Sequence, residues 1–108
     1  MGIDFVIIEK GPKIGGTWLF NTYPGVEVDI HSILYSYSFF KNRFLTQLYS
    51  PGRQIFEYLH DFWKTFKLDE NTKFGAEVTT KTWIPHKRKW QVIIRFQGKQ
   101  VVLKLIRL

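Results

Sequence analysis

The stretch from Gly15 to Tyr35, GGTWLFNTYPGVEVDIHSILY, constrains this chain more than any other. It follows a short apolar run, Ile3 to Glu9, that ends in an acid. Such a run, bounded by turn residues, predicts a strand buried on both faces, the parallel-sheet type. The pair Gly15 and Gly16 then lets the backbone come close to a ligand or adopt positive φ. An acid ending a buried strand can accept hydrogen bonds from the two hydroxyls of a nucleotide ribose, which makes Glu9 a candidate for that role.

A longer series of motifs gives this pattern its specificity. In sequence order the motifs are Glu9-Lys10, Gly15-Gly16-Thr17-Trp18, Asn21-Thr22-Tyr23-Pro24-Gly25, Asp29, Ser32 and Leu34-Tyr35-Ser36. In this order and spacing they resemble the class B flavin-binding monooxygenases, the family of the Baeyer–Villiger and flavin-containing monooxygenases. Gly-Gly-Thr-Trp alone is a weak signal, whereas the whole series is a strong one. The resemblance runs from about Gly2 through Trp90.

The resemblance implies an α/β fold, namely part of a Rossmann-like FAD-binding domain. Its parts would be a parallel strand, a flavin loop, one amphipathic helix and a small antiparallel β-meander. Residues 1–108 would then form an incomplete FAD-binding domain. In the family, a first strand with a Gly-x-Gly-x-x-Gly loop precedes the strand that ends at Glu9, and that loop holds the cofactor pyrophosphate. Neither this loop nor the NADPH domain has a counterpart in the sequence.

The same resemblance implies roles for particular side chains. On the adenosine side, Glu9 would bind the ribose, Lys10 would lie beside the adenosine, and the main chain of Val78 would meet the adenine. On the flavin side, the segment that approaches the ring and its ribityl-pyrophosphate arm contributes Gly16, Thr17 and Trp18. Near the reactive edge of the isoalloxazine, the implied residues are Asp29 as the catalytic candidate, Ile30 through its backbone groups, and Tyr35.

Each assignment has a structural alternative. Glu9 could close a strand and face solvent, and Asp29 could form an Asx-turn or a cap. Tyr35 and Val78 could be core residues. Trp18 could also pack in a core, but we favour the flavin because the flanking glycines have no purpose in a mere core contact.

In the resembled family, FAD reduced by NADPH reacts with molecular oxygen to give a flavin C4a-peroxide. This species oxygenates a small organic substrate, which is a ketone, an amine or a sulfide. The protein holds the flavin, excludes water and positions NADPH. Because the NADPH site lies outside these 108 residues, we expect the chain alone not to turn over.

Composition adds several limits. The sequence holds no cysteine, which excludes a disulfide framework and a thiolate metal site, and its three histidines show no metal-ligand spacing. Without a signal-peptide pattern or an apolar run of membrane-spanning length, we expect a cytoplasmic protein with no transmembrane segment. A net charge of +7 leaves open a small basic interaction module that would contact nucleic acid, through Lys81, Lys87, Arg88, Lys89 and Arg95.

We favour a solvated basic surface over nucleic-acid binding, because the basic residues form no helical stripe and do not interleave with aromatics. A further alternative is a truncated product with no function of its own.

Local patterns predict the remaining elements. Ser50-Pro51 predicts a helix start, with the Ser50 hydroxyl as the N-cap and Pro51 at the first helical position. Apolar residues at helical spacing then predict an amphipathic helix from Pro51 to about Phe66 that packs on a sheet. A helical turn is expected at 17–20, a type II-like turn at Pro24-Gly25 and extended chain at 33–40. A period of two predicts strands at 74–80, 90–96 and 100–106, with a tight turn at 97–99 joining the last two.

Overall fold

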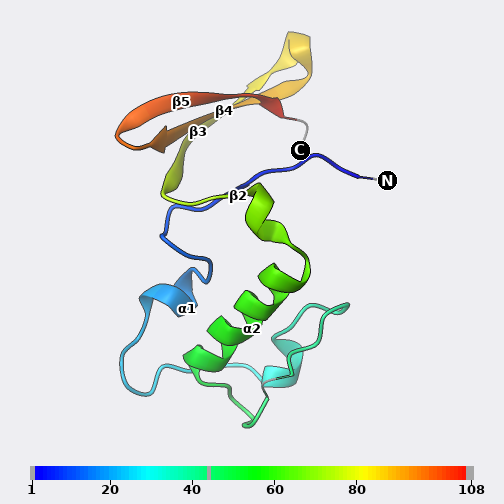
Figure 1. Cartoon of the computed structure of the whole chain (residues 1–108), viewed down its shortest axis with the longest axis vertical. Coiled ribbons are helices and arrows are strands. Elements are labelled where there is room, and N and C mark those ends of the chain that lie inside the picture. The colour runs from blue at the N-terminus through cyan, green and yellow to red at the C-terminus, as the bar shows by residue number, and fades with distance from the viewer. Residues whose placement is uncertain (1, 44, 107–108) are drawn as a thin grey trace. The chain divides into compact units, whose positions relative to one another are not determined.

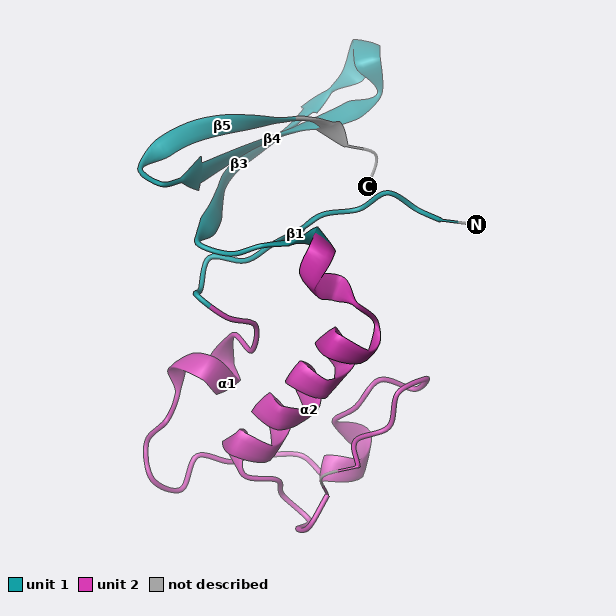
Figure 2. Ribbon diagram, viewed as in Figure 1, with its two compact units in different colours: residues 1–12, 71–108 teal, residues 13–70 magenta. Residues whose placement is uncertain are grey.

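The computed structural model describes residues 2–43 and 45–106 (Figure 1). The chain forms two compact units (Figure 2). Unit 1 comprises residues 1–12 and 71–108, and unit 2 comprises residues 13–70. No helix formed by the described residues is both long enough and apolar enough to cross a lipid bilayer.

Unit 1 contains a short parallel pair at the predicted strand. β1 (Ile7–Ile8) pairs with β2 (Thr72–Lys73), and the Glu9 N–H extends the pairing by donating to the Lys73 carbonyl at 3.0 Å. The predicted burial on both faces is wrong. Both strand residues are half-buried, and Ile3 is 81% exposed, since the strand is only two residues long and most of the apolar run lies outside the sheet.

The rest of unit 1 is the predicted antiparallel meander. β3 (Ala76–Ile84), β4 (Lys89–Phe96) and β5 (Lys99–Ile106) lie in the order β3-β4-β5. Gln97 and Gly98 both have positive φ, as a two-residue hairpin turn requires. The first strand starts two residues later than predicted and runs four residues further, since its pairing with β4 continues to the turn. The core of the sheet consists of Ala76, Val92 and Ile94.

Unit 2 is built around α2 (Gly52–Thr65), with α1 (Thr17–Phe20) packed against it. The predicted amphipathic helix is confirmed, and its buried residues include Ile55 and Tyr58. The predicted cap is wrong. Pro51 is the N-cap, and the Ser50 hydroxyl donates to the Ser32 hydroxyl oxygen at 2.7 Å, so it does not cap the helix. Within its unit the helix packs on α1 and on aromatic side chains, and the expected packing on a sheet stays a prediction.

Residues 33–40 are not extended, contrary to the prediction. A 3₁₀ helix, η1 (Ser32–Leu34), is followed by a tight turn that Tyr37 and Phe40 close through a β-bridge. The Tyr58 hydroxyl holds this turn, because it accepts from the Tyr37 N–H at 2.8 Å and donates to the Phe40 carbonyl at 2.7 Å. Tyr37 also packs on Phe62 of α2, with 4.6 Å between the ring centroids. These aromatics cover the helix instead of forming a strand.

The remaining turns agree with the sequence patterns. The helical turn at 17–20 is confirmed as α1. At Pro24-Gly25 the Val26 N–H donates to the Tyr23 carbonyl at 3.3 Å and Gly25 has φ 83°, as a type II turn requires. Two further 3₁₀ helices are η2 (Leu68–Asn71) and η3 (Pro85–Lys87).

Candidate functional site

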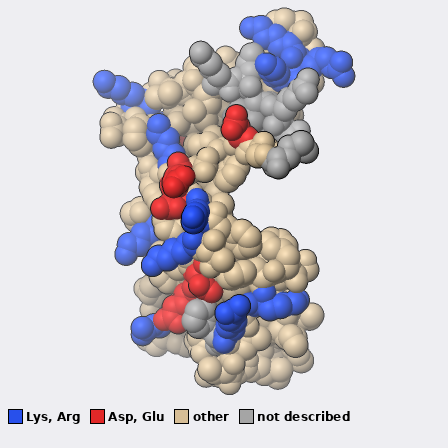
Figure 3. Space-filling view, turned by 45° about the vertical axis from the view of Figure 1, so that its right-hand side comes forward, with Lys and Arg blue, Asp and Glu red and all other residues tan. Residues whose placement is uncertain are grey.

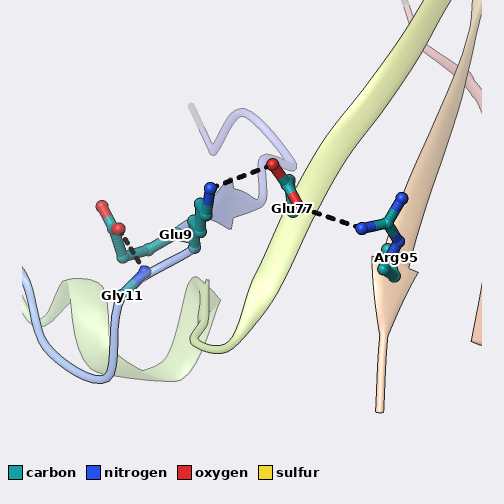
Figure 4. Close-up of polar contacts among 5 residues, drawn as sticks. Glu9, Gly11, Glu77 and Arg95 are labelled. Atoms are coloured by element: carbon teal, nitrogen blue, oxygen red, sulfur yellow. Dashed lines mark hydrogen bonds and ion pairs between the residues drawn. The ribbon is translucent and has the colours of Figure 1, made fainter. Parts of the chain in front are cut away.

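Glu9 lies at the carboxyl end of β1, and a main-chain N–H two residues further on orients its side chain. One carboxylate oxygen, Oε1, accepts from the Gly11 N–H at 2.6 Å (Figure 4). The Glu9 carbonyl accepts from the Ala76 N–H at 3.0 Å, so the chain is fixed on both sides of the acid. Glu9 does close the strand, but it is half-buried rather than open to solvent. The orienting residue, Gly11, carried no motif signal in the sequence.

Lys10 belongs to an ion-pair cluster in the same unit, and Val78 lies next to that cluster on the chain. The Lys10 Nζ lies 3.1 Å from Oε1 of Glu77, and the Arg95 guanidinium lies 3.6 Å from its Oε2 (Figure 4). These groups are largely exposed, so the pairs contribute little stability. Val78, which follows Glu77 on β3, is 40% exposed. The alternative interpretation of Val78 as a core residue is therefore wrong.

The paired glycines differ in what requires them. Both have positive φ, 128° at Gly15 and 51° at Gly16. A Cβ on Gly15 would lie 2.8 Å from the Phe56 ring of α2, whereas a Cβ on Gly16 would meet no atom within 4 Å. Gly15 thus serves packing, which corrects the argument that neither glycine has a purpose in a core contact. Gly16 leaves an open backbone surface directly before α1.

Trp18 and Tyr35, seventeen residues apart, come together in unit 2. The indole Nε1–H donates to the Tyr35 hydroxyl at 3.1 Å, and the two rings meet edge to face with centroids 5.8 Å apart. Gly52 of α2 admits the indole, because a Cβ there would lie 3.1 Å from the Trp18 ring. Both aromatic residues are half-buried, so each keeps accessible ring surface.

Two open pockets in unit 2 share Trp18 in their lining. The larger has a volume of about 410 Å³ and is lined by Trp18, Leu19, Asn21, Thr22, Val26, Arg53 and Phe56. The smaller, of about 330 Å³, is lined by Trp18, Tyr35, Ser36, Tyr37, Tyr58 and Leu59. Both linings are mostly apolar with a few hydroxyl, amide or cationic groups, as in sites for small organic molecules.

Asp29 and Ile30 lie on a loop that is anchored on both sides. On one side, the buried Val28 donates its N–H to the Ser50 carbonyl at 3.0 Å. On the other, the buried Ser32 donates its N–H to the Leu48 carbonyl at 2.8 Å and its hydroxyl to the same oxygen at 3.0 Å. Asp29 and Ile30 are exposed between these anchors. Within the described residues the Asp29 carboxylate accepts no hydrogen bond, so it does not act as a cap there.

Two titratable groups on α2 have shifted pKa values. Burial raises the pKa of the Tyr58 hydroxyl, which the Tyr37 N–H partly offsets. Burial, with smaller contributions from the charges of Lys64 and Lys13, lowers the pKa of His60. The His60 ring packs against the Phe56 ring with 4.4 Å between the centroids and a 51° tilt, and its buried Nε2 has no hydrogen-bond partner in the described structure. Burial therefore favours the neutral form of both side chains.

The candidate residues fall into two groups. Glu9, Lys10 and Val78 belong to unit 1, and the other candidates belong to unit 2. Within unit 2 the structure brings Trp18 and Tyr35 into contact. The anchoring role of Ser32 and Ser50 could not be read from sequence, because a serine before a proline is a typical helix start.

The chain is similar to curated monooxygenases over most of its length. A Baeyer–Villiger monooxygenase of Pseudomonas aeruginosa is 35% identical over 89 residues, which are 82% of this chain and 17% of that enzyme. An FAD-binding monooxygenase of Dothistroma septosporum is 36% identical over 93 residues, which are 86% of this chain and 15% of that enzyme. No protein-family model matches the chain.

Solved structures give the same result. Cyclohexanone monooxygenase from Rhodococcus sp. Phi1, bound to NADP+, matches with a TM-score of 0.73 and 32% identity, over 92% of this chain and 19% of that one. The matches confirm the family resemblance and the predicted fold class. The chain spans about a sixth of the length of the curated relatives it matches.

Proposed function

We propose that this chain, a homologue of one segment of the Baeyer–Villiger-type flavin monooxygenases, forms part of the FAD-binding domain of such an enzyme. The observation that carries the proposal is the Gly16–Trp18 segment. There an open glycine backbone precedes an indole that is hydrogen-bonded to Tyr35. A relative named as an FAD-binding monooxygenase is 36% identical to this chain over 93 residues. FAD is therefore the proposed cofactor.

On the adenosine side, Glu9 is the proposed ribose ligand. The Gly11 N–H occupies one of its oxygens and orients the carboxylate, which leaves Oε2 to accept from ribose hydroxyls. Lys10 would lie beside the adenosine, and its exposed ammonium is already balanced by Glu77. The main chain of Val78 is the proposed contact for the adenine, which the exposure of that residue permits.

On the flavin side, Gly16 and Thr17 offer accessible backbone next to Trp18. Trp18 and Tyr35 would fix a large aromatic surface for the flavin arm, since their hydrogen bond limits the rotation of both rings. Thr17 is exposed and adds a hydroxyl that could bind a ribityl or phosphate oxygen.

Asp29 is the proposed catalytic residue, with Ile30 offering backbone groups to the flavin ring. An exposed carboxylate on an anchored loop is a fixed negative charge without a partner of its own among the described residues. Such a charge can orient a cofactor and pair with an arginine from the nicotinamide-binding part of the enzyme. It would hold the ring in place rather than donate or remove a proton.

The flavin would supply the chemistry, transferring one oxygen atom of O₂ to a small organic substrate at the expense of NADPH. The proposed substrates are ketones, amines or sulfides. We place the NADPH site outside these residues, in line with residues 1–108 as an incomplete FAD-binding domain. Two similar proteins support this proposal: one is named a Baeyer–Villiger monooxygenase, and the other is a cyclohexanone monooxygenase whose structure was solved with NADP+ bound.

A chimera tests this proposal. The matching segment of the Rhodococcus cyclohexanone monooxygenase would be replaced by this chain, and bound flavin would be measured by absorbance after gel filtration. We expect a yellow protein with about one FAD per polypeptide. Glu9→Gln should weaken FAD binding by about 10- to 100-fold, because a hydrogen bond to a charged group is worth roughly 1.5–3 kcal/mol.

A matched control separates the site from general effects of charge. Glu70→Gln removes an exposed acid outside the candidate set and should leave FAD binding unchanged. A chimera that folds by circular dichroism but retains no flavin would contradict the proposal. So would a Glu9→Gln chimera that binds FAD as tightly as its parent.

A further inference from the structure

The charge of this chain is divided unevenly along the sequence. All nine acidic residues lie at or before Glu77, whereas eight of the sixteen Lys and Arg residues lie after it. The stretch that follows Glu77 forms most of the meander of unit 1. Its positive charge exceeds the net +7 of the whole chain, so one part of unit 1 accounts for the basic character of the protein.

The positive charge is densest where β3 turns into β4. Lys87 ends η3, Arg88 has a left-handed conformation with φ 50°, and Lys89 starts β4. Lys81 lies earlier on β3 and is exposed. Lys and Arg side chains gather at this end of the sheet, opposite the β4–β5 turn (Figures 1 and 3).

Three other cations of unit 1 have a partner within the chain. Lys10 and Arg95 share Glu77, and Lys73 lies 4.2 Å from the centre of the Phe96 ring. By contrast, within the described part of the chain no carboxylate forms an ion pair with any cation of the turn, namely Lys81, Lys87, Arg88 and Lys89. Unpaired cations so close together favour an anionic partner.

Two tryptophans adjoin the cations. Trp83 of β3 lies directly opposite Trp90 of β4, and their ring centroids are 5.6 Å apart. Trp90 packs against the core of the sheet, whereas Trp83 is 45% exposed. An exposed indole has an apolar body and a polar N–H, the combination enriched at the boundary between lipid headgroups and acyl chains.

We propose that this hairpin end, formed by Lys81, Trp83, Lys87, Arg88, Lys89 and Trp90, binds the surface of an anionic lipid bilayer. The cations contact headgroup phosphates and carboxylates, and Trp83 lies at headgroup depth. Single-stranded nucleic acid fits less well, because it needs a groove with several stacking rings along its path. Here one exposed ring stands beside a compact cationic turn, which suits a flat anionic surface.

Vesicle sedimentation with the purified 108-residue chain tests the proposal. We expect binding to phosphatidylcholine vesicles that contain about 30–40% phosphatidylserine, and little binding to vesicles of phosphatidylcholine alone. The variant Lys87→Gln/Arg88→Asn/Lys89→Gln should bind roughly 100-fold more weakly, at about fivefold per cation. Asparagine is chosen at position 88 because it tolerates the left-handed conformation.

A control variant that loses the same number of positive charges shows whether the loss of binding depends on where the charges lie. Lys41→Gln/Arg43→Gln/Lys67→Gln removes three exposed cations of unit 2 and should bind nearly as the parent does. Vesicle binding should also shift the tryptophan emission to the blue, and Trp83→Phe should remove most of that shift. Circular dichroism confirms that each variant is folded.

Three results would overturn the proposal: no preference for anionic vesicles, equal losses in the two triple variants, or tighter binding to a dT oligonucleotide than to vesicles. Raising the salt from 0.1 M to about 1 M shortens the screening length from roughly 10 Å to 3 Å and should abolish vesicle binding. Binding that persists unchanged at high salt would also count against it.

Discussion

At the scale of single residues, Gly15 and Gly16 show how neighbouring identical residues can meet different demands. Gly15 faces the Phe56 ring at a distance that a Cβ would occupy, and its φ of 128° is unfavourable for any L side chain. Gly16 faces open space, but its φ of 51° is combined with a ψ of −120°, which lies outside the left-handed α region and is a conformation that L side chains rarely adopt. Packing and backbone conformation together therefore require Gly15, whereas backbone conformation alone requires Gly16.

Alanine substitution at each glycine should separate these demands. Gly16→Ala should lower the free energy of unfolding by about 1–2 kcal/mol, the cost of a backbone conformation that L side chains rarely adopt. Gly15→Ala should cost clearly more, about 2–4 kcal/mol, because backbone strain adds to the clash with Phe56. Urea unfolding followed by circular dichroism measures both. Equal effects would show that the Phe56 contact does not constrain Gly15.

The Tyr58 hydroxyl gives a second prediction at this scale. Tyr58→Phe keeps the buried ring but leaves the Tyr37 N–H and the Phe40 carbonyl without their partner. The free energy of unfolding should fall by about 1–3 kcal/mol. Tyr49→Phe, which removes the hydroxyl of an exposed tyrosine, should stay within about 0.5 kcal/mol of the parent. If Tyr58→Phe left the free energy of unfolding unchanged, the 37–40 turn would be held by ring packing alone.

At the scale of elements, hydrophobic periodicity predicted the regular helix and strands, but it did not predict the segments whose conformation depends on individual tertiary hydrogen bonds. The helical spacing along α2 and the alternation along β4 and β5 are regular, and these elements were predicted closely. Residues 33–40 have high strand propensity, but the Tyr58 hydroxyl folds them into a turn. The serine before α2 was assigned as a cap because its distant partner, Ser32, cannot be inferred from local sequence.

The stability of α2 should depend on pH through His60. Its pKa in the folded state lies below the ordinary value of 6.5, so the unfolded chain binds the proton more tightly. The stabilisation is therefore complete above pH 6.5 and decreases as the pH falls from 6.5 towards the folded pKa. Unfolding curves measured from about pH 7.5 down to about pH 5, an interval that contains the ordinary histidine pKa, should show the loss.

Substitution of the histidine identifies the group responsible. His60→Phe keeps an aromatic ring against Phe56 and should reduce the pH dependence over this interval. His86→Gln, a change on the β3–β4 turn that leaves His60 in place, should retain the dependence of the parent. If His60→Phe and the parent lose stability in parallel, another group is responsible.

At the scale of the whole molecule, the candidate cofactor residues come from two units and several loops. Sequence order and spacing predicted the family and the fold class, because the motif series is long enough to be specific. The supporting contacts of the candidate residues came only from the structure. Gly11 orients Glu9, and Ser32 helps anchor the Asp29 loop, yet neither role follows from a local pattern.

The isolated chain should lack monooxygenase activity. It spans about a sixth of the length of its curated relatives, and we propose that the NADPH site lies outside it. Purified chain mixed with FAD, NADPH and cyclohexanone should therefore oxidise NADPH no faster than the same mixture without the chain. The absorbance of the reduced nicotinamide measures this rate. Substrate-dependent NADPH oxidation by the chain would refute this expectation.

The most direct test of the flavoprotein assignment is the absorbance of the native product, captured from its source with an antibody against residues 15–35. The account predicts a yellow protein with bound FAD and a mass several times the 12.9 kDa of this chain. A colourless product near 12.9 kDa would contradict it, and the small basic interaction module would then become the leading hypothesis.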